Sequence, residues 1–235
     1  MSIDQPVIID PRFNGPPGSG NGGYVCGLLA REIRGPSEIT LRAPPPLGKP
    51  LRLSQANGAV ILADGEILLA EARPAALALE APPAPSLAEA QAAAARYRGL
   101  VNHTYTTCFV CGPGRPAHDG LHLYTGAVEK RAMVACAWTP SADLADGDGR
   151  LGAEFIHAAL DCPSYWALAL AGKPALLARM SAAIDAAAPR IGAPLIVAAW
   201  ALGSEGRKHR GASALYSADG ALIARAEALW IEPRL

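Results

Sequence analysis

Apolar and polar residues alternate along much of this chain with the two-residue period of strands that bury one face. This pattern predicts strands at residues 38–42, 50–54, 59–63, 67–77, 121–124, 130–139, 175–184, 194–202, 210–217 and 222–231. Two largely apolar runs, each entered through a glycine-containing turn, predict helices at residues 23–33 and 153–171. The pattern therefore predicts an α+β protein dominated by antiparallel strands.

These predicted elements occur in the same order twice. Residues 63–72 read ADGEILLAEA and residues 218–228 read ADGALIARAEA, and in each the Asp-Gly pair is a hairpin signal. Each hairpin is preceded by a Gly-x-Pro-Leu strand, and each of these strands by a glycine turn and a helix. Repeats at so long a period indicate two copies of one supersecondary unit.

The segment between the two copies predicts a connecting helix. Ser86 is followed three residues later by Glu89, the pattern of a capping box, and the alanine-rich stretch after it favours a helix over residues 87–98. We therefore divide the chain into an N-terminal repeat, a helical linker and a C-terminal repeat. Their ranges are residues 1–81, 82–105 and 106–235.

Composition narrows the class of protein. The 21 lysines and arginines balance 21 aspartates and glutamates, and no basic block stands out, which argues against a nucleic-acid partner. No apolar run approaches the roughly 20 residues that span a bilayer, and the first residues lack the basic start and apolar core of a signal peptide. Five cysteines, an odd number, do not suggest a disulfide framework. We therefore expect a cytoplasmic protein without a nucleic-acid or membrane partner.

Three stretches resemble the hotdog-fold acyl-CoA thioesterases. Asn21-Gly22-Gly23 stands where many members have His-Gly-Gly at the entrance of the central helix, and residues 158–161 (AALD) look like the family's apolar helix segment that ends in an acidic residue. The stretch from Cys108, CFVCGPGRPAHDGL, resembles the Cys-x-x-Cys-Gly entry of the phenylacetate-type branch. The resemblance covers about residues 12–80 and 106–232. It implies a double hotdog, in which two copies of a long antiparallel sheet each wrap a central helix.

The resemblance also implies where a site would lie. In hotdog thioesterases one half contributes the glycine turn and the other the helical carboxylate, so Asn21, Gly22 and Gly23 would face Asp161. The N–H of Gly23 would lie in the first turn of a helix, where unpaired donors and the helix dipole favour an oxyanion. Asp161 would act as general base on water or as the attacking carboxylate. Asn21 would add a donor or orient the water, although it also suits a helix N-cap.

The duplication predicts that only one of two equivalent positions is active. In the alignment of the copies, Arg31 stands opposite Asp161, and Leu151-Gly152-Ala153 stands opposite the Asn-Gly-Gly turn. The mirror position therefore lacks both the carboxylate and the polar turn residue. Pro163, two residues after Asp161, should kink the helix nearby.

Other polar residues are weaker candidates for substrate binding. His157 stands four residues before Asp161 and can share its helix face, although a structural role is the commoner explanation for a single histidine. Arg207, Lys208 and Arg210 belong to the densest basic cluster, at a predicted hairpin, and in the family such residues often meet the phosphates of coenzyme A. A solvated hairpin tip explains them equally well.

The cysteines permit a second kind of chemistry. Cys108 and Cys111 would form a zinc site with His118 and His122, but six residues between the two pairs fall short of the usual interval of about 12. We therefore expect no metal, and no cofactor apart from the coenzyme A of the substrate. The remaining cysteines stand in apolar runs and are expected in the core: Cys26, Cys136 and Cys162.

Taken together, the sequence predicts an acyl-CoA thioesterase. A non-catalytic acyl-CoA or lipid-binding protein and a hotdog hydratase or dehydratase stay open as alternatives. A zinc-stabilised interaction module would require bound metal. Two halves in one chain suffice for a monomer, while long sheet edges are compatible with a homo-oligomer.

Overall fold

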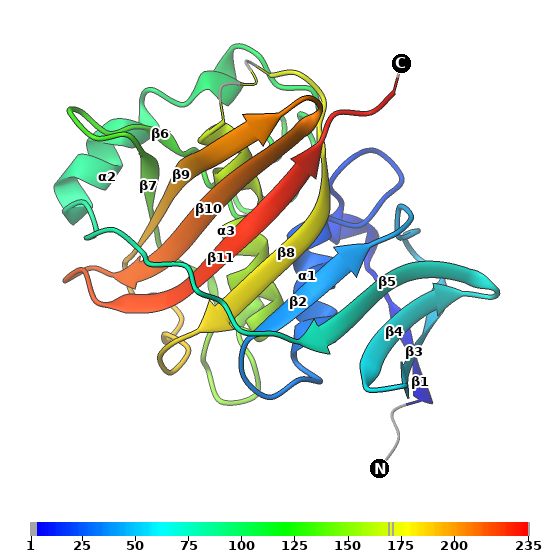
Figure 1. Cartoon of the computed structure of the whole chain (residues 1–235). Helices are drawn as coiled ribbons and strands as arrows, with labels where there is room; N and C mark the ends of the chain where they lie inside the picture. The colour runs from blue at the N-terminus through cyan, green and yellow to red at the C-terminus, as the bar shows by residue number, and fades with distance from the viewer. Residues whose placement is uncertain (1–3, 169, 171, 235) are drawn as a thin grey trace.

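The strands form one continuous antiparallel sheet. The computed structural model describes residues 4–168, 170 and 172–234. Eleven strands lie in the order β1-β3-β4-β5-β2-β8-β11-β10-β9-β7-β6 (Figure 1). Their bounds are β1 Asp4–Ile8, β2 Ser37–Leu41, β3 Pro50–Ala56, β4 Ala59–Asp64, β5 Ile67–Pro74, β6 Gly126–Ala127, β7 Val134–Trp138, β8 Leu176–Ile184, β9 Leu195–Glu205, β10 Lys208–Ser217 and β11 Leu222–Ile231.

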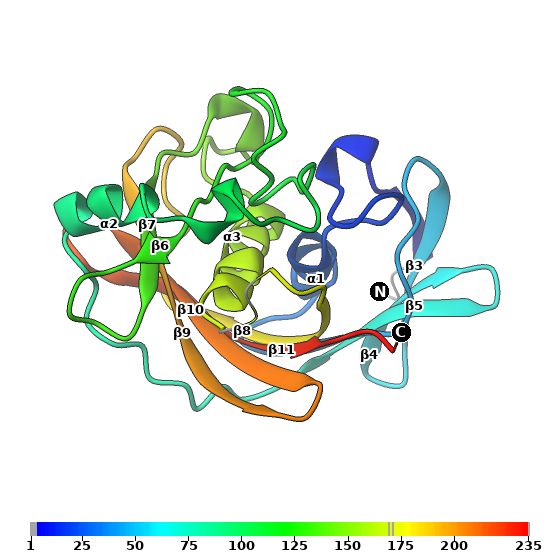
Figure 2. The same ribbon diagram turned by 90° about the horizontal axis from the view of Figure 1, so that it is seen from above.

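Two helices lie side by side on one face of this sheet (Figure 2). They are α1 (Gly22–Ala30) and α3 (Ala153–Trp166), while α2 (Leu87–Ala94) packs near the sheet edge at β7. Three 3-10 turns complete the regular structure: η1 (Pro11–Phe13), η2 (Arg98–Leu100) and η3 (Ala142–Leu144). The main hydrophobic core lies between the sheet and the two helices, where α1 is buried along nearly its whole length.

The sheet consists of two successive runs of strands, each with its own helix. Strands β1–β5 accompany α1, and β6–β11 accompany α3. The two runs meet where β2 pairs with β8, with Ile39 opposite Met180. Hairpins close at Asp64-Gly65 and Asp219-Gly220, where both glycines take positive φ. This is the repeated order of elements that the sequence predicts.

One predicted strand was wrong. The stretch Leu-His-Leu-Tyr after the Cys-x-x-Cys pair does not join the sheet but runs along the preceding loop. There the N–H of Leu121 donates to Phe109 O and the N–H of Leu123 donates to Val110 O. His122 between them has φ 51°, in the left-handed region, which breaks the extended pattern. The prediction also missed β1 and β6, the two short strands at the sheet edges.

The helices begin where predicted but end earlier. The linker helix α2 starts at the capping box of Ser86 and Glu89 and ends at Ala94. Helix α3 contains Pro163 and continues to Trp166; residues 169 and 171, near its predicted end, lie outside the described part of the chain. Among the described residues, no helix has both the length and the apolar character needed to cross a bilayer.

Helices α1 and α3 approach each other unusually closely because of two glycines. A Cβ added at Gly27 would lie 2.3 Å from the Cα of Glu154, and one added at Gly23 would lie 2.4 Å from the Cβ of Asp161. Glycine therefore lets the two backbones meet with no side chain between them. This contact brings the start of α1, from one half of the sheet, against the middle of α3, from the other.

Candidate active site

Helix α1 begins with an N-cap that serves two purposes. Asn21 has an extended backbone, and its Oδ1 accepts a hydrogen bond of 2.9 Å from the N–H of Tyr24. This satisfies one of the unpaired donors of the first turn. The other end of the same amide, Nδ2, donates to Asp161 Oδ2 at 2.7 Å. The cap and the polar contact that the sequence left as alternatives therefore coexist.

The carboxylate of Asp161 is held by the first turn of α1. Its Oδ2 accepts from Asn21 and from the backbone N–H of Gly23, the latter at 3.0 Å, so the helix end interacts directly with the acid. Within the described structure Oδ1 is buried and has no hydrogen-bond partner. The residue itself is 1% exposed. Asp161 is thus an incompletely satisfied buried acid.

Its surroundings change the acidity of Asp161. Burial is the main cause that raises its pKa to about 7; the Gly23 N–H and the Asn21 amide oppose this rise, and nearby Cys108 adds to it. A carboxylic acid that titrates near neutral pH is matched to general-base work, because it can both take up and release a proton there.

A cavity of about 460 Å³ opens onto this acid. Its size is within the range of small-molecule sites. Its inner wall includes Asp161, Asn21 and Gly22, and its apolar wall includes Trp166 and Leu177. Three exposed cations are also among the lining residues: Arg42, Lys173 and Arg207. The cavity is thus largely apolar, with Asp161 at one wall and three exposed cations in its lining, of which Arg42 pairs with Glu71; Glu232 also lines it.

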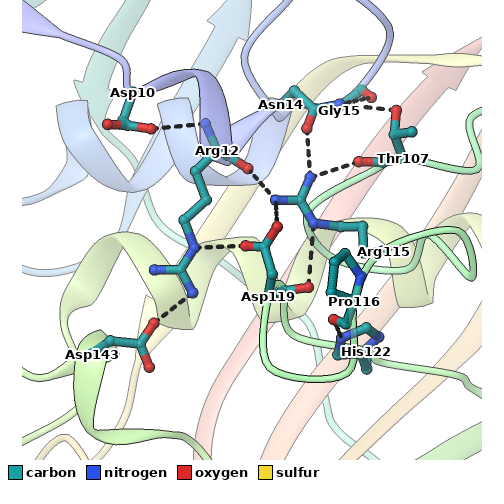
Figure 3. A network of polar contacts seen from close by, with 10 residues as sticks. All are labelled: Asp10, Arg12, Asn14, Gly15, Thr107, Arg115, Pro116, Asp119, His122 and Asp143. Carbon is teal, nitrogen blue, oxygen red and sulfur yellow. Dashed lines mark hydrogen bonds and ion pairs between the residues drawn. The ribbon is translucent and has the colours of Figure 1, made fainter.

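The loop that forms one wall of the cavity is held by a network of charges (Figure 3). Arg115, whose side chain is only 8% exposed, donates to Asp119 Oδ2 at 2.8 Å, Asn14 Oδ1 at 2.7 Å and Thr107 O at 2.8 Å. It also donates to the carbonyl of Arg12, whose own side chain pairs with Asp119 at 2.8 Å. The network ties the segment carrying the Cys-x-x-Cys pair to the N-terminal segment that leads into α1.

No protein-family profile and no protein of curated function matches this sequence. Solved structures do match it. A TesB protein of Mycobacterium avium subsp. paratuberculosis is 14% identical with a TM-score of 0.62, over 98% of this chain and 93% of that one. A proposed thioesterase of Novosphingobium aromaticivorans is 16% identical with a TM-score of 0.64, over 98% and 96%. A hotdog protein of unknown function from Alicyclobacillus acidocaldarius is 11% identical with a TM-score of 0.55, over 100% and 94%. The chain has the hotdog fold.

Within this hotdog fold, the structure gathers some of the predicted residues and separates others. Asn21, Gly22, Asp161 and Arg207 line the cavity, and Gly23 contacts the acid directly. The other three predicted residues are not part of the cavity lining: His157, Lys208 and Arg210. The composite of a glycine turn from one half and an acid from the other is therefore present.

The three residues outside the cavity have other contacts or surroundings. His157 is buried, its Nδ1 lies 2.8 Å from the carbonyl of Ala153, and burial lowers its pKa. Arg210 pairs with Glu227 at 3.3 Å, and Lys208 is exposed at the start of β10. Only the first residue of the basic hairpin therefore reaches the cavity.

The mirror position of the hotdog repeat has none of these contacts. Arg31 caps the end of α1 and pairs with Glu32 at 3.3 Å. Gly152 caps α3 without a side-chain hydrogen bond, and Leu151 is buried. The two ends of the helix pair are therefore chemically different, and the acid is held at one of them.

The sequence missed three parts of this site. Arg42 and Lys173 reach the cavity from loops whose folding no local pattern shows. The third feature is Cys162, assigned to the core from the sequence, which lines the cavity together with Cys108 and Cys111. The alternative zinc set with His118 and His122 does not form among the described residues: His118 is exposed, and His122 contacts Tyr124 and Pro116.

Proposed function

We propose that this protein hydrolyses an acyl-CoA thioester, with the acyl group in the cavity and Asp161 at the reacting carbonyl. The observation that carries the proposal is a buried acid, held by a helix N-terminus, at the wall of a largely apolar cavity with exposed cations in its lining. An acyl chain suits the apolar wall, and the coenzyme A phosphates suit the exposed cations.

The hydrogen bonds support a particular division of roles. The N–H of Gly23 is engaged by Asp161, and that of Tyr24 by Asn21. Gly22 is the first residue of α1 and lines the cavity, and within the described structure its N–H has no hydrogen-bond partner. We therefore assign the oxyanion donor to Gly22, with Gly23 positioning the acid.

Asp161 serves in one of two balanced routes. As general base it takes a proton from water, the hydroxide adds to the thioester carbonyl, and the coenzyme A thiolate leaves and is protonated. As nucleophile it attacks the carbonyl, releases the thiolate and forms an acyl-aspartyl anhydride that water then cleaves. After a single turnover in ¹⁸O-labelled water, label in Asp161 would identify the anhydride route with water attacking the aspartyl carbonyl, because the general-base route leaves Asp161 unlabelled.

The proposal is tested by following free-thiol release from short, medium, long and aromatic acyl-CoAs. Turnover on one class supports hydrolysis and names the acyl group. Absence of turnover on every class, together with a rise in melting temperature on adding an acyl-CoA, would instead establish the binding protein that the sequence left open. A hydratase is disfavoured because His157 does not reach the cavity.

A further inference from the structure

Three thiols meet at the cavity wall. Cys108 and Cys111 belong to the loop held by Arg115, which donates to the carbonyl of Thr107, and Cys162 belongs to α3. All three sulfur atoms lie within 4.8 Å of one another, and the Sγ atoms of Cys108 and Cys162 are 3.6 Å apart. Each cysteine is buried, and each lines the cavity.

The first of these thiols, that of Cys108, stands at the start of a tight backbone turn. The N–H of Gly112 donates to the carbonyl of Cys108 at 2.9 Å, and a Cβ at Gly112 would lie 2.4 Å from the carbonyl oxygen of Thr106. The turn therefore brings Cys108 and Cys111 close together, and cysteine binds metals in its thiolate form.

The spacing of the sulfurs suits a tetrahedral metal ion. Zinc–sulfur bonds of about 2.3 Å at tetrahedral angles place neighbouring sulfurs about 3.8 Å apart. The 3.6 Å between Cys108 and Cys162 lies close to this value, and the 4.8 Å limit for the group requires only a small contraction. A single disulfide would use two of the three thiols and leave the third unpaired. A soft divalent ion uses all three.

His103 lies next to this cluster, in a role other than ligand. Its Nε2 is 3.3 Å from Cys111 Sγ, but its Nδ1 accepts a hydrogen bond of 3.0 Å from the N–H of Tyr105. The acceptor role of Nδ1 leaves the proton on Nε2, which therefore donates toward Cys111, whose carbonyl oxygen lies at 3.1 Å and whose Sγ lies at 3.3 Å. A neutral N–H donor of this kind can orient a cysteine ligand in the way that surrounding hydrogen bonds support metal ligands.

We propose that Cys108, Cys111 and Cys162 bind one Zn²⁺ ion as thiolates, with the fourth coordination position open to the cavity. No fourth His, Cys, Asp or Glu joins the group within the described residues, and all three cysteines face the same cavity. The ion would fasten the loop to α3, linking Cys108 to a residue 54 positions later in the chain, and fix that wall of the cavity. The site adjoins the candidate active site, since Cys162 Sγ lies 4.0 Å from Asp161 Oδ2, but the proposal of a metal does not rest on the proposed hydrolysis.

Metal content of the full-length protein tests the site. The protein is purified without chelators under reducing conditions, and zinc is measured per chain. We expect about one zinc in the wild type, and less than about 0.1 in Cys108→Ser and Cys162→Ser. Cys136→Ser is the matched control, because Cys136 is also buried but lies on β7 outside the group, and it should retain the metal.

Cobalt substitution of the wild type keeps the proposal testable even if the cysteine variants fail to fold. Added Co²⁺ should give sulfur-to-cobalt charge-transfer absorption and the intense visible bands of tetrahedral cobalt. Imidazole should then change the visible bands, because it can take the open position. A wild-type protein without zinc and without charge-transfer absorption would overturn the site. Equal metal loss in the Cys136→Ser control would do the same, and visible bands that imidazole leaves unchanged would overturn the open position.

Discussion

Replacing Asp161 with asparagine should make the protein more stable at pH 8. The acid is buried, its Oδ1 has no partner in the described structure, and burial raises its pKa to about 7 from the ordinary 3.8. A raised carboxyl pKa means that the folded state prefers the protonated acid. Its contribution to stability is therefore fully present below about pH 3.8 and is lost as pH rises through 7.

The size of the effect follows from these values. Two pKa values about 3 units apart correspond to a cost of about 4 kcal/mol for the ionised acid at pH 8. Asparagine removes this cost and keeps an oxygen that can accept from Asn21 and Gly23. Its NH₂ group then occupies the place of the unpartnered Oδ1, and an unsatisfied buried donor costs about 1–3 kcal/mol. The expected net gain is about 1–3 kcal/mol at pH 8, and it should disappear near pH 5.

Urea unfolding at pH 8 and pH 5 measures this gain, with Asp148→Asn as the matched control. Asp148 is an exposed aspartate, and its substitution should change the free energy of unfolding by less than about 0.5 kcal/mol. An Asp161→Asn protein that is equally or less stable than wild type at pH 8, with an unchanged m-value, would refute the reasoning. It would mean that the acid is better solvated than the structure indicates.

Three further predictions follow from the same contacts. Gly23→Ala should cost about 3 kcal/mol or more in thermal unfolding, because its Cβ would overlap α3, whereas Gly147→Ala, with open space around its Cβ, should be nearly neutral. Asn21→Ala should lower the free energy of unfolding by about 1 kcal/mol and kcat by at least about tenfold. Asn21→Ser should restore the free energy of unfolding, because serine is also a good N-cap, but not kcat. If serine restored both quantities equally, the role of Asn21 would be capping alone. Arg207→Ala should raise KM for an acyl-CoA about tenfold with kcat unchanged, whereas Lys208→Ala should leave KM unchanged. An equal rise of KM in both variants, measured by steady-state kinetics, would contradict a specific role of Arg207.

The fold was predictable where local patterns carry the information. The Asp-Gly pairs, the alternating strands and the capping box at Ser86 each specify their own neighbourhood, and the repeat of their order indicated two similar halves. The edge strand β6 has only two residues, and β1 is exposed along almost its whole length, so neither shows the alternation of a strand with one buried face. The stretch from Leu121 was mistaken for a strand because its apolar residues alternate as in a strand. In the structure these residues pack along a loop, and His122 takes a left-handed backbone conformation that the sequence pattern does not show.

The candidate site was predictable only in part, because several of its contacts join residues that are far apart in sequence. The Asn-Gly-Gly turn and Asp161 were found through the resemblance and the duplication, and the structure brings them together. The hydrogen bond from the Gly23 N–H to Asp161 joins residues 138 positions apart in sequence. It depends on how closely their two helices pack, which no local pattern shows. Cys162 looked like a core residue because its partners, Cys108 and Cys111, reach it only through tertiary packing.

The most direct test of the central claim compares kcat/KM for the best acyl-CoA substrate between the wild type and Asp161→Asn, with Asp148→Asn alongside. We predict a loss of at least ~100-fold in Asp161→Asn and no significant change in the control. The folded state of each protein is checked by the unfolding experiment above. Hydrolysis that continues at the wild-type rate in a folded Asp161→Asn protein would contradict the assignment of this acid to the reaction.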